Sequence, residues 1–212
     1  KLKLLKKLDL NYQLKNKYFM KIQLVDRNYE MCEQWKLYFN NCEDVIVYNG
    51  GFFDLETECV VSPANSFGFM DGGLDLVISD TLGWQIQRKL QITINEKYDG
   101  ELLVGQAELI ETDNLNIPYC ISAPTMRIPL HLTGSVNVYL AAKAIFRILK
   151  QNQNKINIVT ISGLGTGVGK VPFDVCANQM KHAYDDVWLN KEIFPETLRS
   201  SMEKHQLLIT KK

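Results

Sequence analysis

Short apolar runs alternate along the chain with longer segments in which apolar residues recur every three or four positions. The short runs are rich in Val and Ile, as β-strands are, and some are apolar throughout, as strands covered on both faces are. They predict strands at 21–26, 44–49, 59–62, 106–112, 118–124 and 156–164. The apolar run at 205–210 predicts one last strand.

The longer segments have the period of amphipathic helices. Residues 135–152 show it most clearly, with Val138 and Ile145 on one face and basic residues in the last turns. Further helices are predicted at 28–41, at 72–98 with a break near Gly83, and at 172–190. Strands that alternate with helices predict an α/β fold with helices on both faces of a mostly parallel sheet.

The length of 212 residues suits one substantial domain, and the composition, 46% hydrophobic and 23% charged, is that of an ordinary globular protein. We expect a single domain at 20–212. The basic segment at 1–19 is expected to be a leader outside it, either disordered or derived from cloning; a native extension and a juxtamembrane stub of a longer protein are the alternatives. Lys plus Arg and Asp plus Glu both number 24, so net charge gives no strong signal for a nucleic-acid partner.

The five cysteines are odd in number and scattered, without a CxxC pair, and the three histidines lie far apart. This pattern argues against a disulfide framework or a metal site, and no cofactor is expected. Free cysteines indicate a reducing compartment, so we expect a cytoplasmic protein. No apolar stretch reaches 18 residues, and no membrane span is predicted in this chain.

Four glycines alternate with other residues in one loop, just after a predicted strand and before a predicted helix: Gly163, Gly165, Gly167 and Gly169. Backbone N–H groups at a helix start attract anions, and glycine lets a phosphate approach them closely. The loop fits neither the P-loop spacing nor GxGxxG. It predicts a phosphate site, with a flexible turn as the plain alternative.

A second loop, SPANSFGFMDGGLD at 62–75, follows the apolar run CVVS. Its Asn65, Gly72, Gly73 and Asp75 resemble the first ADP-ribose-binding loop of the macro domain family, in which an Asn-containing turn precedes a glycine pair and an acidic helix start.

The glycine-rich loop resembles the other phosphate loop of that family. Its Thr166, Gly167 and Val168 match a T-G-hydrophobic core that leads into a proline-started helix, here opened by Pro172. The resemblance spans roughly residues 44–190. It implies a three-layer α/β/α sandwich with a mixed, mostly parallel central sheet.

The resemblance also implies roles. Asn65 would hydrogen-bond the hydroxyls of the distal ribose, and the backbone of Gly72 and Gly73 would lie against the diphosphate and that ribose. Asp75 would assist attack of water on the anomeric carbon, which makes Asp75 and Asn65 the expected catalytic pair. The diphosphate would be wrapped from the other side by Gly165, Thr166, Gly167, Val168 and Gly169. Taken alone, Asn65 also suits a turn and Asp75 a helix cap.

The sequence departs from the family pattern in three places. Gly51 stands where the family has an Asp that recognises the adenine amino group. That contact is therefore expected to be missing unless Asp54 or a backbone group replaces it. The next residue, Phe52, is expected either to contact the base or to pack in the core. Ser62 replaces a frequent Asn, and Gly169 replaces an aromatic residue that covers the distal ribose, which implies a more open pocket.

Charged residues outside these loops have plainer interpretations. Arg127 follows a predicted strand end, where it would face the ligand or, more simply, form a surface salt bridge. Asp185 and Asp186 are expected on a solvated helix face.

The predicted function is binding of ADP-ribose and its hydrolysis from a modified protein, nucleic acid or small-molecule adduct. One alternative is a non-catalytic reader of ADP-ribose or a related nucleotide signal. Another is an α/β domain that binds a different phosphorylated metabolite. The expected partner is ADP-ribose or an ADP-ribosylated substrate.

Overall fold

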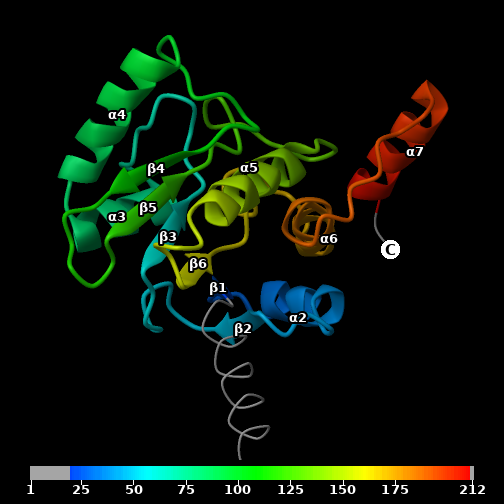
Figure 1. Ribbon diagram of the computed structural model, residues 1–212, viewed down its shortest axis with the longest axis horizontal. Coiled ribbons are helices and arrows are strands. Elements are labelled where there is room, and N and C mark those ends of the chain that lie inside the picture. Colours follow the sequence, from blue (N-terminus) through cyan, green and yellow to red (C-terminus); the bar gives the residue numbers. More distant parts are fainter. Residues whose placement is uncertain (1–19, 211–212) are drawn as a thin grey trace, which may run out of the picture.

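A computed structural model describes residues 20–210, so the predicted leader at 1–19 lies outside the described residues. A six-stranded sheet forms the centre of the domain (Figure 1). Its strands are β1 (Lys21–Asp26), β2 (Val45–Asn49), β3 (Cys59–Ser62), β4 (Glu108–Glu111), β5 (Tyr119–Ser122) and β6 (Ile158–Ile161). The six strands predicted between 21 and 164 are therefore confirmed, several of them over fewer residues.

The strands are ordered β2-β1-β6-β3-β5-β4. All neighbouring pairs are parallel except β4 and β5, which pair antiparallel. The predicted mixed, mostly parallel sheet is confirmed. Because five strands share one direction, their carboxyl ends meet along one edge of the sheet, the edge where α/β proteins bind ligands.

Helices cover both faces of the sheet (Figure 1). Alternate residues of β3 point to opposite faces: Cys59 and Val61 belong to one core and Val60 to the other. The first core is covered by α2 (Tyr29–Tyr38), α5 (Asn137–Gln151), α6 (Phe173–Ala183) and the π-helix η1 (Tyr184–Trp188), and the second by α3 (Gly73–Leu82) and α4 (Gln85–Lys97). The three-layer sandwich is thus confirmed, and α3 and α4 are separated at Gly83, where the break was predicted.

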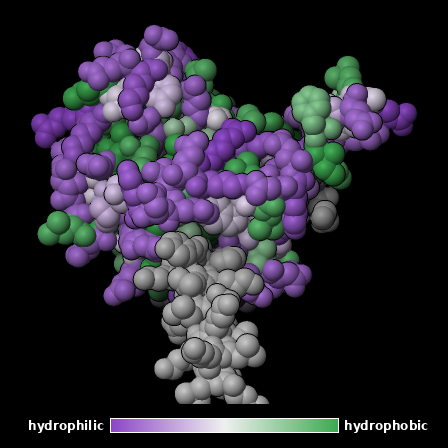
Figure 2. All heavy atoms as spheres, viewed as in Figure 1, coloured by the Kyte–Doolittle hydropathy of each residue, from purple (hydrophilic) through white to green (hydrophobic). Residues whose placement is uncertain are grey.

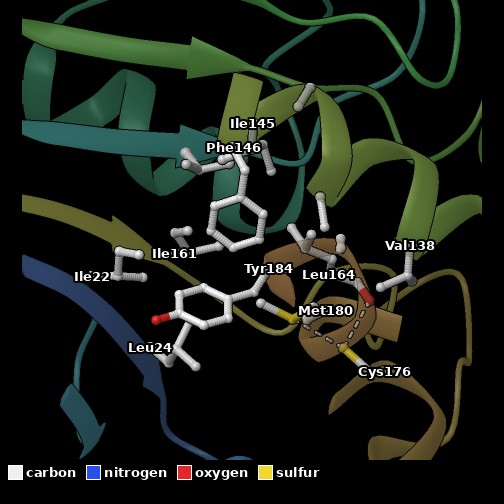
Figure 3. Close-up of a cluster of buried hydrophobic side chains, with 14 of the residues drawn as sticks. Ile22, Leu24, Val138, Ile145, Phe146, Ile161, Leu164, Cys176, Met180 and Tyr184 are labelled. Carbon is white, nitrogen blue, oxygen red and sulfur yellow. Dashed lines mark hydrogen bonds between the residues drawn. The ribbon is translucent and has the colours of Figure 1, made fainter. Parts of the chain in front are cut away.

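The larger core is built around Tyr184, which packs against Phe146 in an edge-to-face arrangement with ring centroids 5.8 Å apart. Figure 3 shows both rings beside side chains of the sheet. In the same cluster the Cys176 thiol donates to the carbonyl of Leu164 at 3.3 Å. This contact attaches the start of the glycine-rich loop to the first turns of α6.

Residues 205–210 lie at the end of a helix, α7 (Leu198–Ile209), so the predicted last strand is wrong. A short segment with three consecutive apolar residues does not distinguish a strand from a helix, and the helix here begins with a capping box formed by Thr197 and Ser200. α7 projects at one side of the domain (Figure 1), and apolar side chains gather on and before it (Figure 2). The most exposed of them are Ile193, Phe194 and Leu198.

The prediction that Asp186 lies on a solvated face is wrong, because this residue is only 9% exposed. Its carboxylate accepts from the Tyr139 hydroxyl at 2.6 Å and from Lys204 Nζ at 2.9 Å. The helix widens into η1 at Tyr184, and the π-helical turn moves the following side chains away from the positions that an α-helical period predicts. Asp185 is partly buried and paired with Lys181.

The five cysteines are free, and Cys59 and Cys120 are among those that are buried. Within residues 20–210, no group of three His, Cys, Asp or Glu side chains is placed to hold a metal ion. None of the helices in that range is long and apolar enough to cross a bilayer.

Candidate functional site

A cavity of about 610 Å³ lies at the carboxyl ends of the parallel strands. Segments that follow β1, β2, β3, β5 and β6 all contribute to its wall. The structure brings every residue singled out for the site to this one cavity: Phe52, Asn65, Gly72, Gly73, Asp75, Gly165, Thr166, Gly167, Val168 and Gly169. Their roles toward a ligand remain predictions.

The glycine-rich loop is folded back on itself. Gly165 has a left-handed backbone (φ +69°), and its carbonyl accepts from the Val171 N–H at 3.1 Å. The Lys170 N–H donates to the Gly167 carbonyl at 3.3 Å. In the described part of the chain, the N–H groups of residues 165–169 donate to no protein acceptor. The turn therefore leaves a run of free N–H groups on the cavity wall, an arrangement suited to an anion.

The start of α3 adds a second set of free N–H groups. Gly72 is its N-cap residue and no side chain caps it. The first four N–H groups of a helix have no partner inside the helix, and the helix dipole makes this end attractive to negative charge. Among the described residues that line the cavity, one is basic, Arg27. An anion in the cavity would therefore be bound mainly by backbone N–H groups.

Asp75, in the first turn of α3, accepts a hydrogen bond from the Ser62 hydroxyl, with 2.6 Å between Ser62 Oγ and Asp75 Oδ1. Ser62 is fully buried at the end of β3. Burial raises the pKa of Asp75 from its ordinary 3.8 to about 6, although the hydrogen bond from Ser62 acts in the opposite direction. Within residues 20–210 the Asp75 side chain is hydrogen-bonded by Ser62 and caps no N–H group at the start of α3.

The Asn65 side chain forms hydrogen bonds with the backbone of its own loop. Its Nδ2 donates to the Phe69 carbonyl at 2.8 Å, and its Oδ1 accepts from the N–H groups of Phe67 and Phe69. The turn interpretation of Asn65 is therefore observed. The side chain also lines the cavity, so turn formation and a place at the ligand coexist.

Both interpretations of Phe52 agree with its position, because it lines the cavity and also packs against the smaller core.

Arg127 does not line the cavity. It forms the salt bridge that was the simpler expectation, with Nε 2.9 Å from Oε2 of Glu101.

Sequence reasoning missed two residues that line the cavity, Asp26 at the end of β1 and Arg27 directly after it. The available signal was topological: the carboxyl end of the first predicted strand reaches the same edge as the two loops. It also missed the contact of Ser62 with Asp75, because these residues are 13 positions apart and meet only when α3 packs on the sheet.

Comparison with known proteins gives a family and a fold. A family model described as "Macro domain" matches residues 61–180. An uncharacterized protein of Aquifex aeolicus is 35% identical over 137 residues, which cover 65% of this chain and 78% of that protein. An uncharacterized protein of Saccharolobus solfataricus is 24% identical over 160 residues, covering 75% and 83%.

Solved structures show the same architecture. The macrodomain of Mycobacterium tuberculosis DarG superposes with a TM-score of 0.55 at 18% identity, covering 65% of this chain and 87% of that one. An Oceanobacillus iheyensis macrodomain solved with ADP gives a TM-score of 0.57 at 16% identity, covering 75% and 84%.

Proposed function

The chain belongs to the macro domain family, and on that premise we propose that it binds ADP-ribose in the cavity and hydrolyses the bond that joins ADP-ribose to a carrier. The diphosphate lies against the free N–H groups of residues 165–169 and of the start of α3. The distal ribose lies near Asn65, Gly72 and Gly73, with its anomeric carbon toward Asp75. The carrier is a protein, a nucleic acid or a small molecule.

The proposal of hydrolysis rests on the hydrogen bonding and the pKa of Asp75. One carboxylate oxygen is held by Ser62, and the pKa is raised to about 6 by burial. A base with a pKa near the working pH is ionised and still accepts a proton readily. Water attacks the anomeric carbon, Asp75 takes a proton from that water, and the carrier leaves with the electrons of the broken bond.

A non-catalytic reader is the second candidate, favoured by the loop at Gly169. Gly169 lines the cavity and has no aromatic side chain, which the family pattern places there to cover the distal ribose. Titration with ADP-ribose followed by incubation with an ADP-ribosylated protein separates the two. Binding with release of ADP-ribose supports the hydrolase, and binding without release from protein, nucleic-acid or small-molecule adducts supports the reader. Absence of binding at high micromolar ADP-ribose contradicts both.

Asn65→Ala is expected to weaken ADP-ribose binding about tenfold, the effect of losing one or two hydrogen bonds that place the loop and the ribose. Calorimetric titration measures it. Asn114→Ala is the matched control, because the Asn114 side chain also accepts from two backbone N–H groups in a turn but lies away from the cavity. Unchanged affinity in Asn65→Ala would show that the distal ribose lies elsewhere.

Ser62→Ala is expected to move the pH dependence of hydrolysis. The hydrogen bond from Ser62 lowers the pKa of Asp75, so its loss shifts the inflection upward from about pH 6, by about one pH unit for a bond of ordinary strength. A rate profile between pH 5 and 9 measures the shift.

Ser122→Ala is the control for this profile. Ser122 pairs in register with Ser62 on the neighbouring strand and is equally buried, and its hydroxyl has no partner within residues 20–210. We expect its profile to match the wild type. The same inflection in Ser62→Ala and wild type would mean that Ser62 does not act on Asp75.

A further inference from the structure

Exposed apolar side chains gather at one end of the cavity. Among the described residues, three large apolar ones line the cavity and are between 45% and 57% exposed: Phe69, Val77 and Val168. Phe69 belongs to the loop that the Asn65 side chain holds together. Val77 lies just after Asp75 in α3, and Val168 lies in the glycine-rich loop. All three are therefore at the end proposed for the distal ribose, from which the carrier leaves.

The segment after β5 adds further apolar side chains to this end. Pro129 lines the cavity, and its neighbours Ile128 and Leu130 are exposed although they do not line it. The group of exposed apolar residues is thus wider than the cavity itself. We call it the apolar rim, and it consists of Phe69, Val77, Ile128, Leu130 and Val168.

Backbone hydrogen bonds hold the segments of the apolar rim side by side. The Ser66 N–H donates to the Arg127 carbonyl at 3.2 Å, which joins the loop after β3 to the segment after β5. The Leu132 N–H donates to the Gly169 carbonyl at 2.7 Å, which joins that segment to the glycine-rich loop. The apolar rim is therefore one surface beside the cavity, built from segments that follow three neighbouring strands.

The charged residues next to the apolar rim balance one another. Arg127 is paired with Glu101, with 2.9 Å between Arg127 Nε and Glu101 Oε2. Asp71 and Lys170 are both exposed and have opposite charges. A nucleic-acid strand is bound through Lys and Arg side chains that neutralise several of its phosphates. A balanced and apolar surface lacks that attraction, and it matches an uncharged, apolar segment of polypeptide.

We propose that the apolar rim binds apolar side chains of a polypeptide carrier beside the residue that bears ADP-ribose, and so selects modified sites with apolar neighbours. Exposed apolar patches of this kind mark surfaces that bind a partner. A small-molecule carrier would reach the cavity wall but leave Ile128 and Leu130 uncovered, since both lie outside that wall. The inference rests on the proposed function and names the chemistry of its carrier, for a hydrolase and for a reader alike.

The test is the affinity of the Asp75→Asn protein, in which turnover is expected to be slow, for three ADP-ribose adducts. Two adducts are peptides that differ only in having leucine or serine on both sides of the modified residue. The third is an ADP-ribosylated single-stranded oligonucleotide, and free ADP-ribose is the reference. Competition measured by fluorescence anisotropy is expected to show about tenfold tighter binding of the leucine peptide than of the other two adducts, the effect of partly burying one or two apolar side chains.

A double variant, Ile128→Ser with Leu130→Ser in the same background, is expected to bind the two peptides equally and to keep its affinity for free ADP-ribose. Both side chains are exposed, so the fold is expected to be kept, and the melting temperature checks this. Leu37→Ser with Ile92→Ser is the matched control. It makes the same change at exposed residues of α2 and α4 that do not line the cavity, and it is expected to keep the preference.

Three results would overturn the role of the apolar rim and leave the proposed function intact. They are equal affinity for the two peptides, tightest binding of the oligonucleotide, and an unchanged preference in the Ile128→Ser, Leu130→Ser variant. A wild-type dimer that this variant converts to a monomer would assign the rim to a second copy of the chain and overturn the inference as well. Failure to bind free ADP-ribose would overturn the proposed function itself, and the inference with it.

Discussion

Asp75→Asn is expected to lower the rate of ADP-ribose release by roughly a hundredfold to ten-thousandfold, the contribution of a positioned general base. The amide still accepts the hydrogen bond from Ser62, so the local packing is kept, but it takes no proton from water. ADP-ribose affinity is expected to stay equal or to rise slightly, because a negative charge is removed near the diphosphate. Single-turnover release from an ADP-ribosylated protein measures the rate, and calorimetry measures the affinity.

The pH profile of wild type belongs to the same prediction. A base with a pKa of about 6 is protonated below that pH, so the rate is expected to rise through pH 6 and to level off above pH 7. Asp80→Asn is the matched control, since Asp80 is exposed on α3 and does not line the cavity. If Asp75→Asn releases ADP-ribose at the wild-type rate, or if the wild-type rate does not change between pH 5 and 8, Asp75 is not the general base.

Stability provides an independent readout of Asp75. Its pKa in the folded protein, about 6, is above the ordinary 3.8, so the folded state binds the proton more tightly than the unfolded state does. This contribution to stability is complete below pH 3.8 and is lost as the pH rises through 6. The loss is on the order of 3 kcal/mol. Asp75→Asn is therefore expected to melt at a higher temperature than wild type at pH 7.5, with the difference shrinking toward pH 4.

The parts of the fold that the sequence predicts are those set by local pattern. Consecutive apolar residues, such as those at 59–61, predict a strand that is covered on both faces of the sheet. The site loops are predicted for a related reason. A site built from free backbone N–H groups requires the backbone to approach the ligand closely. Glycine allows this approach, so alternating glycines after a strand indicate such a site.

Features that depend on packing between distant segments could not be predicted in this way. Asp186 is buried where Tyr139 of α5 and Lys204 of α7 contact its carboxylate, and no local residue pattern marks contacts with those distant helices. The sequence shows that Ser62 replaces an Asn that is frequent in the family. Its hydrogen bond to Asp75 could not be predicted, because it depends on how α3 packs on the sheet. Gly51 and Asp54 are only three residues apart, yet no sequence pattern indicates that the Asp54 carboxylate fills the space beside Gly51.

Gly169→Ala is expected to lower both the stability of the fold and the affinity for ADP-ribose. A Cβ at this position would lie 2.4 Å from the backbone oxygen of Gly165 and 3.0 Å from Leu132 Cδ1. Backbone cannot yield as a flexible side chain does, so the loop must open, and the hydrogen bond from Leu132 N–H to the Gly169 carbonyl is strained with it. We expect a loss of about 1–3 kcal/mol in unfolding free energy. ADP-ribose affinity is expected to fall more than about tenfold, because the loop N–H groups no longer converge.

Gly167→Ala separates folding from binding in the same loop. A Cβ at Gly167 meets nothing within 4 Å, and the residue has no left-handed backbone, so stability is expected to stay within about 0.5 kcal/mol of wild type. Its affinity falls only if a phosphate approaches that backbone closely. Denaturant melts and calorimetric titration of both variants give the comparison. A Gly169→Ala protein as stable as wild type would mean that the loop adopts another conformation in solution. Two stable variants that both bind ADP-ribose normally would place the diphosphate away from this loop.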